Sequence, residues 1–283
     1  MNSMPPILIG DLFRELSVET IRLLIRLTPD EWTRSTVSSE RTVKDIASHL
    51  LDGSLRRLSC QRDHYTPPPG VMTPRTDESL VDFLHRLNAE WETATRRLSP
   101  HVIVNLLEWA HDQTAILFES LDPFGPAIFP VSWLGDTSSL NWMDIAREYT
   151  EKWHHTQQIF EATGHPSRIT TRRMFHPCLD TFLRALPYTY RQVPAAEGAV
   201  VAVEITGEAG GFWFIQRQGE QWQQVAAAPG AITSRVVLDQ ESAWKLFTKR
   251  RNHADIRHQF ANIYVEGDRE LGSYVLDMVS VVA

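Results

Sequence analysis

The chain has 283 residues, 42% of them hydrophobic and 22% charged, which is typical of a soluble globular protein with room for two domains. A formal net charge of −7, from 35 acidic and 28 basic residues, argues against a nucleic-acid-binding surface. The chain shows no secretory signal and no apolar run of about 18 residues, which excludes a membrane span, and its two cysteines, Cys60 and Cys178, favour a reducing, cytoplasmic setting.

Apolar residues recur at helical spacing through the first half of the chain. Thr42 and Asp45 have the spacing of a capping box, which predicts that a helix begins there. The segment from Thr28 to Trp32 is expected to interrupt the helical pattern between the first two helices. Gly164 and Pro166 are expected to end the last helix of this half. The helices predicted in this half are, in chain order, 9–27, 42–59, 77–98, 100–120 and 140–163.

The periodicity changes after Pro166, where short β-rich runs alternate with glycines and polar residues. A helix is expected first, then a series of strands interrupted by two further helices. Such a series predicts an α+β domain, so we expect two domains, 1–166 and 167–283. The predicted strands are 199–205, 212–216, 222–227, 232–238 and 261–265, and the predicted helices are 174–186, 241–251 and 269–279.

Three residues have the pattern of a metal site. Glu151 and His155 lie four residues apart on a predicted helix, so their side chains point the same way, and His49 lies in a second predicted helix. Two histidines and a carboxylate suit zinc or another divalent metal and leave a coordination position open. His154 points about 100° away from His155, so it is either a residue behind the ligands or a surface residue.

The same segments resemble a known family. Trp32, residues 41–50 (RTVKDIASHL) and residues 148–159 (EYTEKWHHTQQI) resemble the mycothiol-dependent maleylpyruvate isomerase family, within the DinB-like metalloenzyme superfamily. The resemblance implies an N-terminal DinB-like four-helix bundle with zinc bound by His49, Glu151 and His155. Residues 243–250 (AWKLFTKR) and 265–271 (VEGDREL) resemble the family's C-terminal domain, which is α+β and similar to sterol carrier proteins.

The resemblance also implies an activity. A low-molecular-weight thiol, mycothiol or a related one, would bind the zinc and add to an electrophilic small molecule, giving isomerisation or S-transfer. Arg250 is implied to contact the substrate, with Arg251 as an equal candidate. The expected partners are these two small molecules, with no nucleic acid and no membrane, and the protein is expected to be a monomer or a homodimer.

Other assignments follow from the residues alone. Arg56 and Arg57, one to two turns after His49, are candidates to contact an anionic group of the thiol cosubstrate, although arginines on helix surfaces are common. Two other functions stay open: a metal-containing binding or regulatory module without catalysis, and a zinc hydrolase with Glu148 as the base. Four aromatic residues are expected to pack in the core and loops, with a pocket wall as the alternative: Trp109, Phe124, Phe129 and Trp133.

Overall fold

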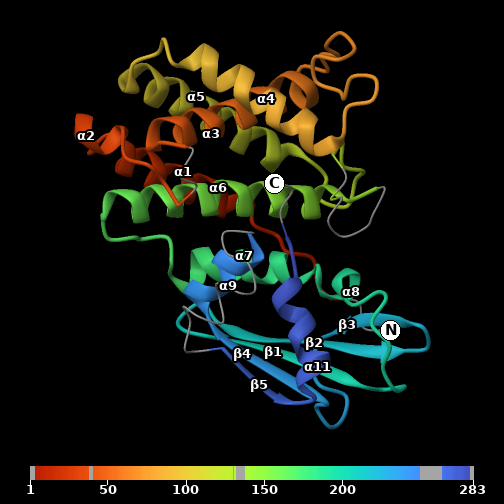
Figure 1. The fold of residues 1–283 in the computed structure, drawn as a ribbon. Coiled ribbons are helices and arrows are strands. Elements are labelled where there is room, and N and C mark those ends of the chain that lie inside the picture. The colour runs from red at the N-terminus through yellow and green to blue at the C-terminus, as the bar shows by residue number, and fades with distance from the viewer. Residues whose placement is uncertain (1–3, 38–40, 130, 132–137, 249–262, 281–283) are drawn as a thin grey trace. The chain divides into compact units, whose positions relative to one another are not determined.

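The computed structural model describes residues 4–37, 41–129, 131, 138–248 and 263–280, which form two compact units (Figure 1). The helical unit comprises Ile9–Ile128 and Glu151–Ile169. The sheet unit comprises Met1–Leu8, Phe129–Thr150 and Thr170–Val282. Trp133, Arg250 and Arg251 lie outside the described residues. The domain boundary between residues 166 and 167 stays a prediction.

The helical unit is built from long helices that pack along one another. Helix α5 contacts both α1 and α3, and α3 also contacts α4. The elements of this unit are α1 (Gly10–Leu24), α2 (Pro29–Trp32), α3 (Val43–Arg57), the π-helical turn η1 (Leu58–Arg62), α4 (Leu80–Thr95), α5 (Pro100–Ser120) and, from Glu151 onward, α6 (Asn141–Thr163).

Side chains that cap the helices explain where they begin. Thr42 accepts a hydrogen bond from the backbone of Asp45, and the Asp45 carboxylate accepts one from the backbone of Thr42, so the predicted capping box is confirmed. Ser99 caps α5, with Pro100 at its first position. The segment predicted only as a break forms α2, because Thr28 and Glu31 make a second capping box.

Three helices of this unit differ from their predicted bounds by more than one residue. The helix predicted over 9–27 ends earlier, at Leu24. The helix predicted over 42–59 continues from α3 into the π-helical turn η1, which apolar spacing alone does not reveal. The helix predicted over 77–98 begins later, at Leu80, where the Ser79 side chain caps it, and ends at Thr95.

The sheet unit contains a mixed five-stranded sheet with the order β3-β2-β1-β4-β5. Strands β1 and β4 are parallel, and the other neighbouring pairs are antiparallel. Its strands are β1 (Val200–Thr206), β2 (Gly211–Gln218), β3 (Gln221–Val225), β4 (Ser234–Asp239) and β5 (Tyr264–Gly267), and its other helices are α7 (Arg172–Leu183), α8 (Leu186–Thr189), α9 (Gln240–Phe247) and α11 (Arg269–Ser273).

One face of this sheet is covered by helices. Trp213 and Ile215 on β2 are buried, whereas Phe212 on the opposite face is exposed. Figure 1 shows α7 and α9 along the same side of the sheet, and the Trp213 indole donates a hydrogen bond to Asp180 of α7. The predicted α+β class is therefore confirmed.

The last predicted helix, 269–279, is wrong in its extent. The α-helix α11 stops at Ser273, and a 3-10 turn, η3 (Tyr274–Asp277), follows it. Val275 and Leu276 of this turn are buried, so the apolar residues that suggested a longer helix pack inward from a 3-10 turn instead. None of the described helices has the combination of length and apolar character that crossing a membrane requires.

A buried histidine on α5 gives a prediction about stability. Burial and then the nearby Lys152 lower the pKa of His111 well below its usual value, and its Nδ1 has no hydrogen-bond partner among the described protein atoms. The folded protein therefore keeps His111 neutral, whereas the unfolded chain protonates it below a pKa of about 6.5. This stabilising contribution is present above that pH and is lost as the pH falls.

We expect protonation of His111 in the unfolded chain to lower the free energy of unfolding by about 1.4 kcal/mol when the pH falls from 8 to 5.5. In a His111→Leu variant that share of the pH dependence should disappear. Urea denaturation of both proteins at the two pH values measures it. Equal pH dependence in the two proteins would show that His111 is not held neutral.

Candidate metal centre

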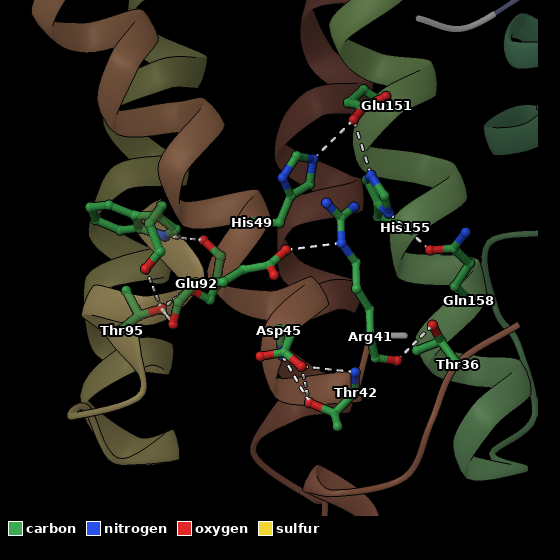
Figure 2. A network of polar contacts seen from close by, with 12 residues as sticks. Thr36, Arg41, Thr42, Asp45, His49, Glu92, Thr95, Glu151, His155 and Gln158 are labelled. Carbon is green, nitrogen blue, oxygen red and sulfur yellow. Dashed lines mark hydrogen bonds and ion pairs between the residues drawn. The ribbon is translucent and has the colours of Figure 1, made fainter. Parts of the chain in front are cut away.

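Helix α3 carries His49, and contacts with α4 fix the chain at Ser48 and just before the helix begins. The Trp91 indole donates a hydrogen bond of 2.8 Å to the Ser48 carbonyl, and the Ser48 hydroxyl donates one of 2.6 Å to Thr95. Arg41, just before α3, forms an ion pair of 2.9 Å with Glu92 (Figure 2). These contacts hold the position of His49 in the helical unit.

Helix α6 carries Glu151 and His155, and it is fixed against α1 by residues on another of its faces. The hydroxyls of Thr156 and Thr20 are 2.9 Å apart, and the Lys152 ammonium donates a hydrogen bond to Ser17. Because residues 152 and 156 face α1, residues 151 and 155 are turned toward a different neighbour. That neighbour is His49.

The three predicted ligands converge on one point. Both Nε2 of His49 and Nε2 of His155 approach the same oxygen, Oε1 of Glu151, at 3.2 and 3.0 Å (Figure 2). One ligand atom from each residue can be chosen so that all three lie within 4.8 Å of one another. The His155 side chain is 2% exposed, that of His49 13% and that of Glu151 34%, so Glu151 is the most exposed of the three.

These distances suit a shared cation. Donor atoms bound to one tetrahedral zinc ion at about 2.0–2.1 Å stand about 3.3–3.4 Å apart. The two nitrogen-to-oxygen distances, 3.0 and 3.2 Å, are within a few tenths of an ångström of that spacing. Small side-chain shifts would let all three residues bind the ion.

The hydrogen bonds of His155 lead to the same conclusion. Its Nδ1 lies 2.9 Å from the Gln158 side-chain oxygen, and its Nε2 lies 3.0 Å from the Glu151 carboxylate. Both ring nitrogens therefore face acceptors, but a neutral imidazole has only one N–H to donate. A cation between Nε2 and Glu151 leaves the Nδ1 proton for Gln158, which is the usual arrangement of a metal-binding histidine.

The charge of Glu151 also fits a metal ligand. Burial acts to raise the pKa of its carboxyl, but the electrostatic effect of His155 and His154 and the hydrogen bonds with His155 and His49 outweigh burial. The pKa therefore lies well below its usual value. Glu151 is anionic at neutral pH, which is the form that binds a cation.

Two nearby residues complete the surroundings. The sequence left His154 as either a residue that supports the ligands or a surface residue. His154 is buried, with Nδ1 3.8 Å from the second Glu151 oxygen, so the first alternative fits the structure. Gln158, fully buried, was not singled out from the sequence as a partner of His155. Its spacing of three residues from His155 was the available signal.

Gln158 gives a second prediction. Replacing it with Leu removes the acceptor that orients His155, so zinc affinity should fall by about 10- to 100-fold. Competition with a chromophoric chelator measures the dissociation constant. Gln158→Glu, which keeps an acceptor at that position, should retain most of the affinity.

A matched control is Gln157→Leu, since Gln157 is also buried but accepts a hydrogen bond from Ser167 instead. If the Gln157 and Gln158 variants lose zinc affinity equally, the loss comes from general destabilisation, and the orienting role of Gln158 is wrong.

The arginines predicted to contact a cosubstrate are already engaged. Arg57 is buried, with its guanidinium over the Phe118 ring and a hydrogen bond to Gln61. Arg56 forms an ion pair of 3.0 Å with the buried Asp52, whose pKa is raised by burial although Arg56 and His49 act against this. Arg56 is the more accessible of the two. Arg250 falls outside the described residues, so its role stays a prediction.

The helical unit with its His/Glu centre and the mixed-sheet unit define an α+β protein with a candidate metal site. Two solved structures share this fold: the mycothiol-dependent maleylpyruvate isomerase, with a TM-score of 0.55, and a histidine-to-alanine mutant of that enzyme, with a TM-score of 0.54. Each match covers 91% of both chains at 12% sequence identity. No family model and no curated protein matches the chain. The resemblance inferred from the sequence is thus confirmed at the level of the fold.

Proposed function

We propose that this protein is a zinc-dependent enzyme that activates a low-molecular-weight thiol for addition to an electrophilic small molecule. The observation that carries the proposal is the approach of His49 and His155 to one oxygen of Glu151, at 3.2 and 3.0 Å. The shared fold with a mycothiol-dependent maleylpyruvate isomerase supports mycothiol or a close relative as the thiol.

The finer description of the two domains belongs to the same proposal. We regard residues 1–166 as a DinB-like four-helix bundle and residues 167–283 as a domain similar to sterol carrier proteins. The packing of α1, α3, α4 and α5, and the one-sided covering of the sheet, support this description. A cytoplasmic location remains our expectation from the sequence.

The charges of His49, Glu151 and His155 determine which kind of further ligand a bound metal ion favours. His49 and His155 are neutral when they bind a metal, and Glu151 contributes one negative charge, so a divalent ion keeps a net charge of +1. When bound, zinc lowers the pKa of a coordinated thiol far enough that the sulfur is a thiolate at neutral pH. Gln158 keeps the Nδ1 proton on His155, so that its Nε2 stays available to the metal.

The reaction then divides according to the fate of the adduct. The thiolate adds to one carbon of an activated alkene, and the π electron pair moves onto the neighbouring carbonyl group. Rotation about the new single bond and loss of the same thiolate give the isomer with no net change in atoms. Protonation of the adduct instead gives a thioether, which is S-transfer. Both outcomes use the same described residues.

The test offers zinc-loaded protein mycothiol together with maleylpyruvate, the substrate named for the structural neighbour. We expect isomerisation that requires the thiol, or consumption of the thiol as a thioether adduct. His155→Ala should reduce either rate to the level without protein, whereas His85→Ala, at an exposed position on α4, should not. Retention of the small molecules without turnover would instead support the binding or regulatory module.

Arg250 provides a separate prediction. An arginine that contacts an anionic substrate but not the metal can be removed without loss of zinc. We therefore expect Arg250→Ala to keep its full zinc content and to lower kcat/KM for an anionic substrate by about 10-fold or more. Unchanged kinetics would remove Arg250 from the proposed site.

The hydrolase alternative has no comparable support. It needs Glu148 as a general base, but the Glu148 carboxylate is engaged by the Arg147 guanidinium. An ion pair of this kind stabilises the anion and makes it a weaker base.

A further inference from the structure

Helix α5 has large apolar side chains on its outer face. Val102 and Leu106 are each 40% exposed, Ile116 is 47% exposed and Trp109 is 49% exposed. Trp109 was expected from the sequence to pack in the core or a loop, and the structure corrects that expectation. Four such residues on one helix need an explanation beyond the scattered apolar residues found on any surface.

Their spacing makes a continuous stripe. Positions 102, 106, 109 and 116 follow the alternating steps of four and three residues of a heptad repeat, with Gln113 in the remaining position. The stripe is about 21 Å long at 1.5 Å per residue. The opposite face of α5 is also apolar and is buried in the helical unit, through Ile103, Val104, Leu107, Ala110, Ala115, Leu117 and Phe118. The outer stripe is therefore a second apolar face, of the kind that a partner helix covers.

The stripe is symmetric about Trp109. Val102 lies seven residues before it and Ile116 seven residues after it, so two copies of α5 in antiparallel orientation bring Val102 of each opposite Ile116 of the other. Leu106 then falls close to Gln113. A surface that matches itself in this way closes a twofold dimer without leaving an unmatched face.

The charges near the two ends of α5 are complementary in the same orientation. Arg96 and Arg97, both exposed, precede the helix. Glu119 and Asp122 lie at its other end, where Arg14 binds Glu119. In an antiparallel pair, each basic end lies beside the acidic end of the partner, and among the described residues Arg97 has no carboxylate within ion-pair distance.

We propose that the outer face of α5 is a homodimer interface, in which two copies of the helix pack antiparallel about a twofold axis at Trp109. The rim charges orient the pair, and the apolar stripe supplies the buried surface. This proposal is independent of the proposed enzymatic function.

Sedimentation equilibrium of the full chain tests the oligomeric state. We expect a mass of about 65 kDa, which is twice the 32.4 kDa of one chain. Trp109→Glu should give 32.4 kDa, because it places a charge at the centre of the interface. Ile25→Glu is the matched control, since Ile25, directly after α1, is 64% exposed and lies outside the stripe, and this variant should stay dimeric.

Cross-linking tests the orientation. In a Cys60→Ser background, Trp109→Cys should link two chains through a short bis-maleimide reagent, because helices pack about 8–10 Å apart. Val102→Cys should not link to itself, because its two copies would lie about 21 Å apart along the helix axes. The double change Val102→Cys and Ile116→Cys should link efficiently.

Several outcomes would overturn the proposal. They are a wild-type protein that stays monomeric up to about 100 μM, a dimer that survives Trp109→Glu, and efficient linking through Val102→Cys alone. A monomeric wild-type protein would mean that the apolar stripe of α5 binds a different protein. Efficient linking through Val102→Cys alone would mean that the two helices pack parallel. Arg97→Glu should weaken the dimer by several-fold without changing the zinc content, and an unchanged dissociation constant would show that the rim charges do not contribute.

Discussion

His155→Ala is expected to lower the zinc content of the purified protein from about one ion per chain to less than about 0.1. Two ligands remain after the change, and a site with so few protein donors does not retain zinc through dialysis. His49→Ala should have the same effect, since the geometry gives the two histidines equivalent contacts with Glu151. Inductively coupled plasma mass spectrometry after dialysis measures the ion content.

The control for this prediction is His85→Ala, which removes an exposed histidine from α4 and should keep the full zinc content. Full occupancy in His49→Ala or His155→Ala would refute the ligand assignment directly. A loss of zinc in all three variants would point to general instability rather than to ligation.

The same variants connect the metal to stability. A ligand that binds only the folded state stabilises it by about 4 kcal/mol at a free concentration of 1,000 times its dissociation constant. Adding a chelator should therefore lower the melting temperature of the wild-type protein. It should leave the melting temperature of His155→Ala unchanged, because that variant has no bound zinc to lose. Differential scanning calorimetry with and without chelator distinguishes the two cases.

The second large effect is expected in the sheet unit, at Trp244 of α9. This side chain is among the largest that are fully buried, and its removal leaves a cavity in addition to the lost apolar contacts. We expect Trp244→Ala to lower the free energy of unfolding by about 3–5 kcal/mol. Urea denaturation followed by circular dichroism measures the change.

The control for Trp244 is Phe212→Ala, because Phe212 is a large aromatic residue on the exposed face of the same sheet. Its loss should be less than about 1 kcal/mol. The folded fraction of Trp244→Ala should keep its zinc, since all three proposed ligands belong to the helical unit. A Trp244 effect no larger than the Phe212 effect would contradict the buried position of the indole.

Much of this protein follows from local sequence patterns. The capping box of Thr42 and Asp45, the bounds of α5 and the four-residue spacing of Glu151 and His155 depend only on residues within one helix. Local hydrogen bonds and helical periodicity are properties of neighbouring residues, so the sequence alone determines them. The α+β class follows in the same way from the change in periodicity after Pro166.

Other features depend on residues far apart in the chain, and they follow only from the way the helices and strands pack. The approach of His49 to Glu151 requires α3 and α6 to pack in one register, and the parallel pairing of β1 with β4 requires a particular sheet order. Arg57 and Trp109 have the opposite exposure to what their residue types suggest, because burial is set by what packs against each helix face. Local sequence patterns thus give the helices and the pair of candidate ligands on α6. Packing across about a hundred residues brought His49 to the other two, since that contact depends on the free energy of the whole core rather than on any local preference.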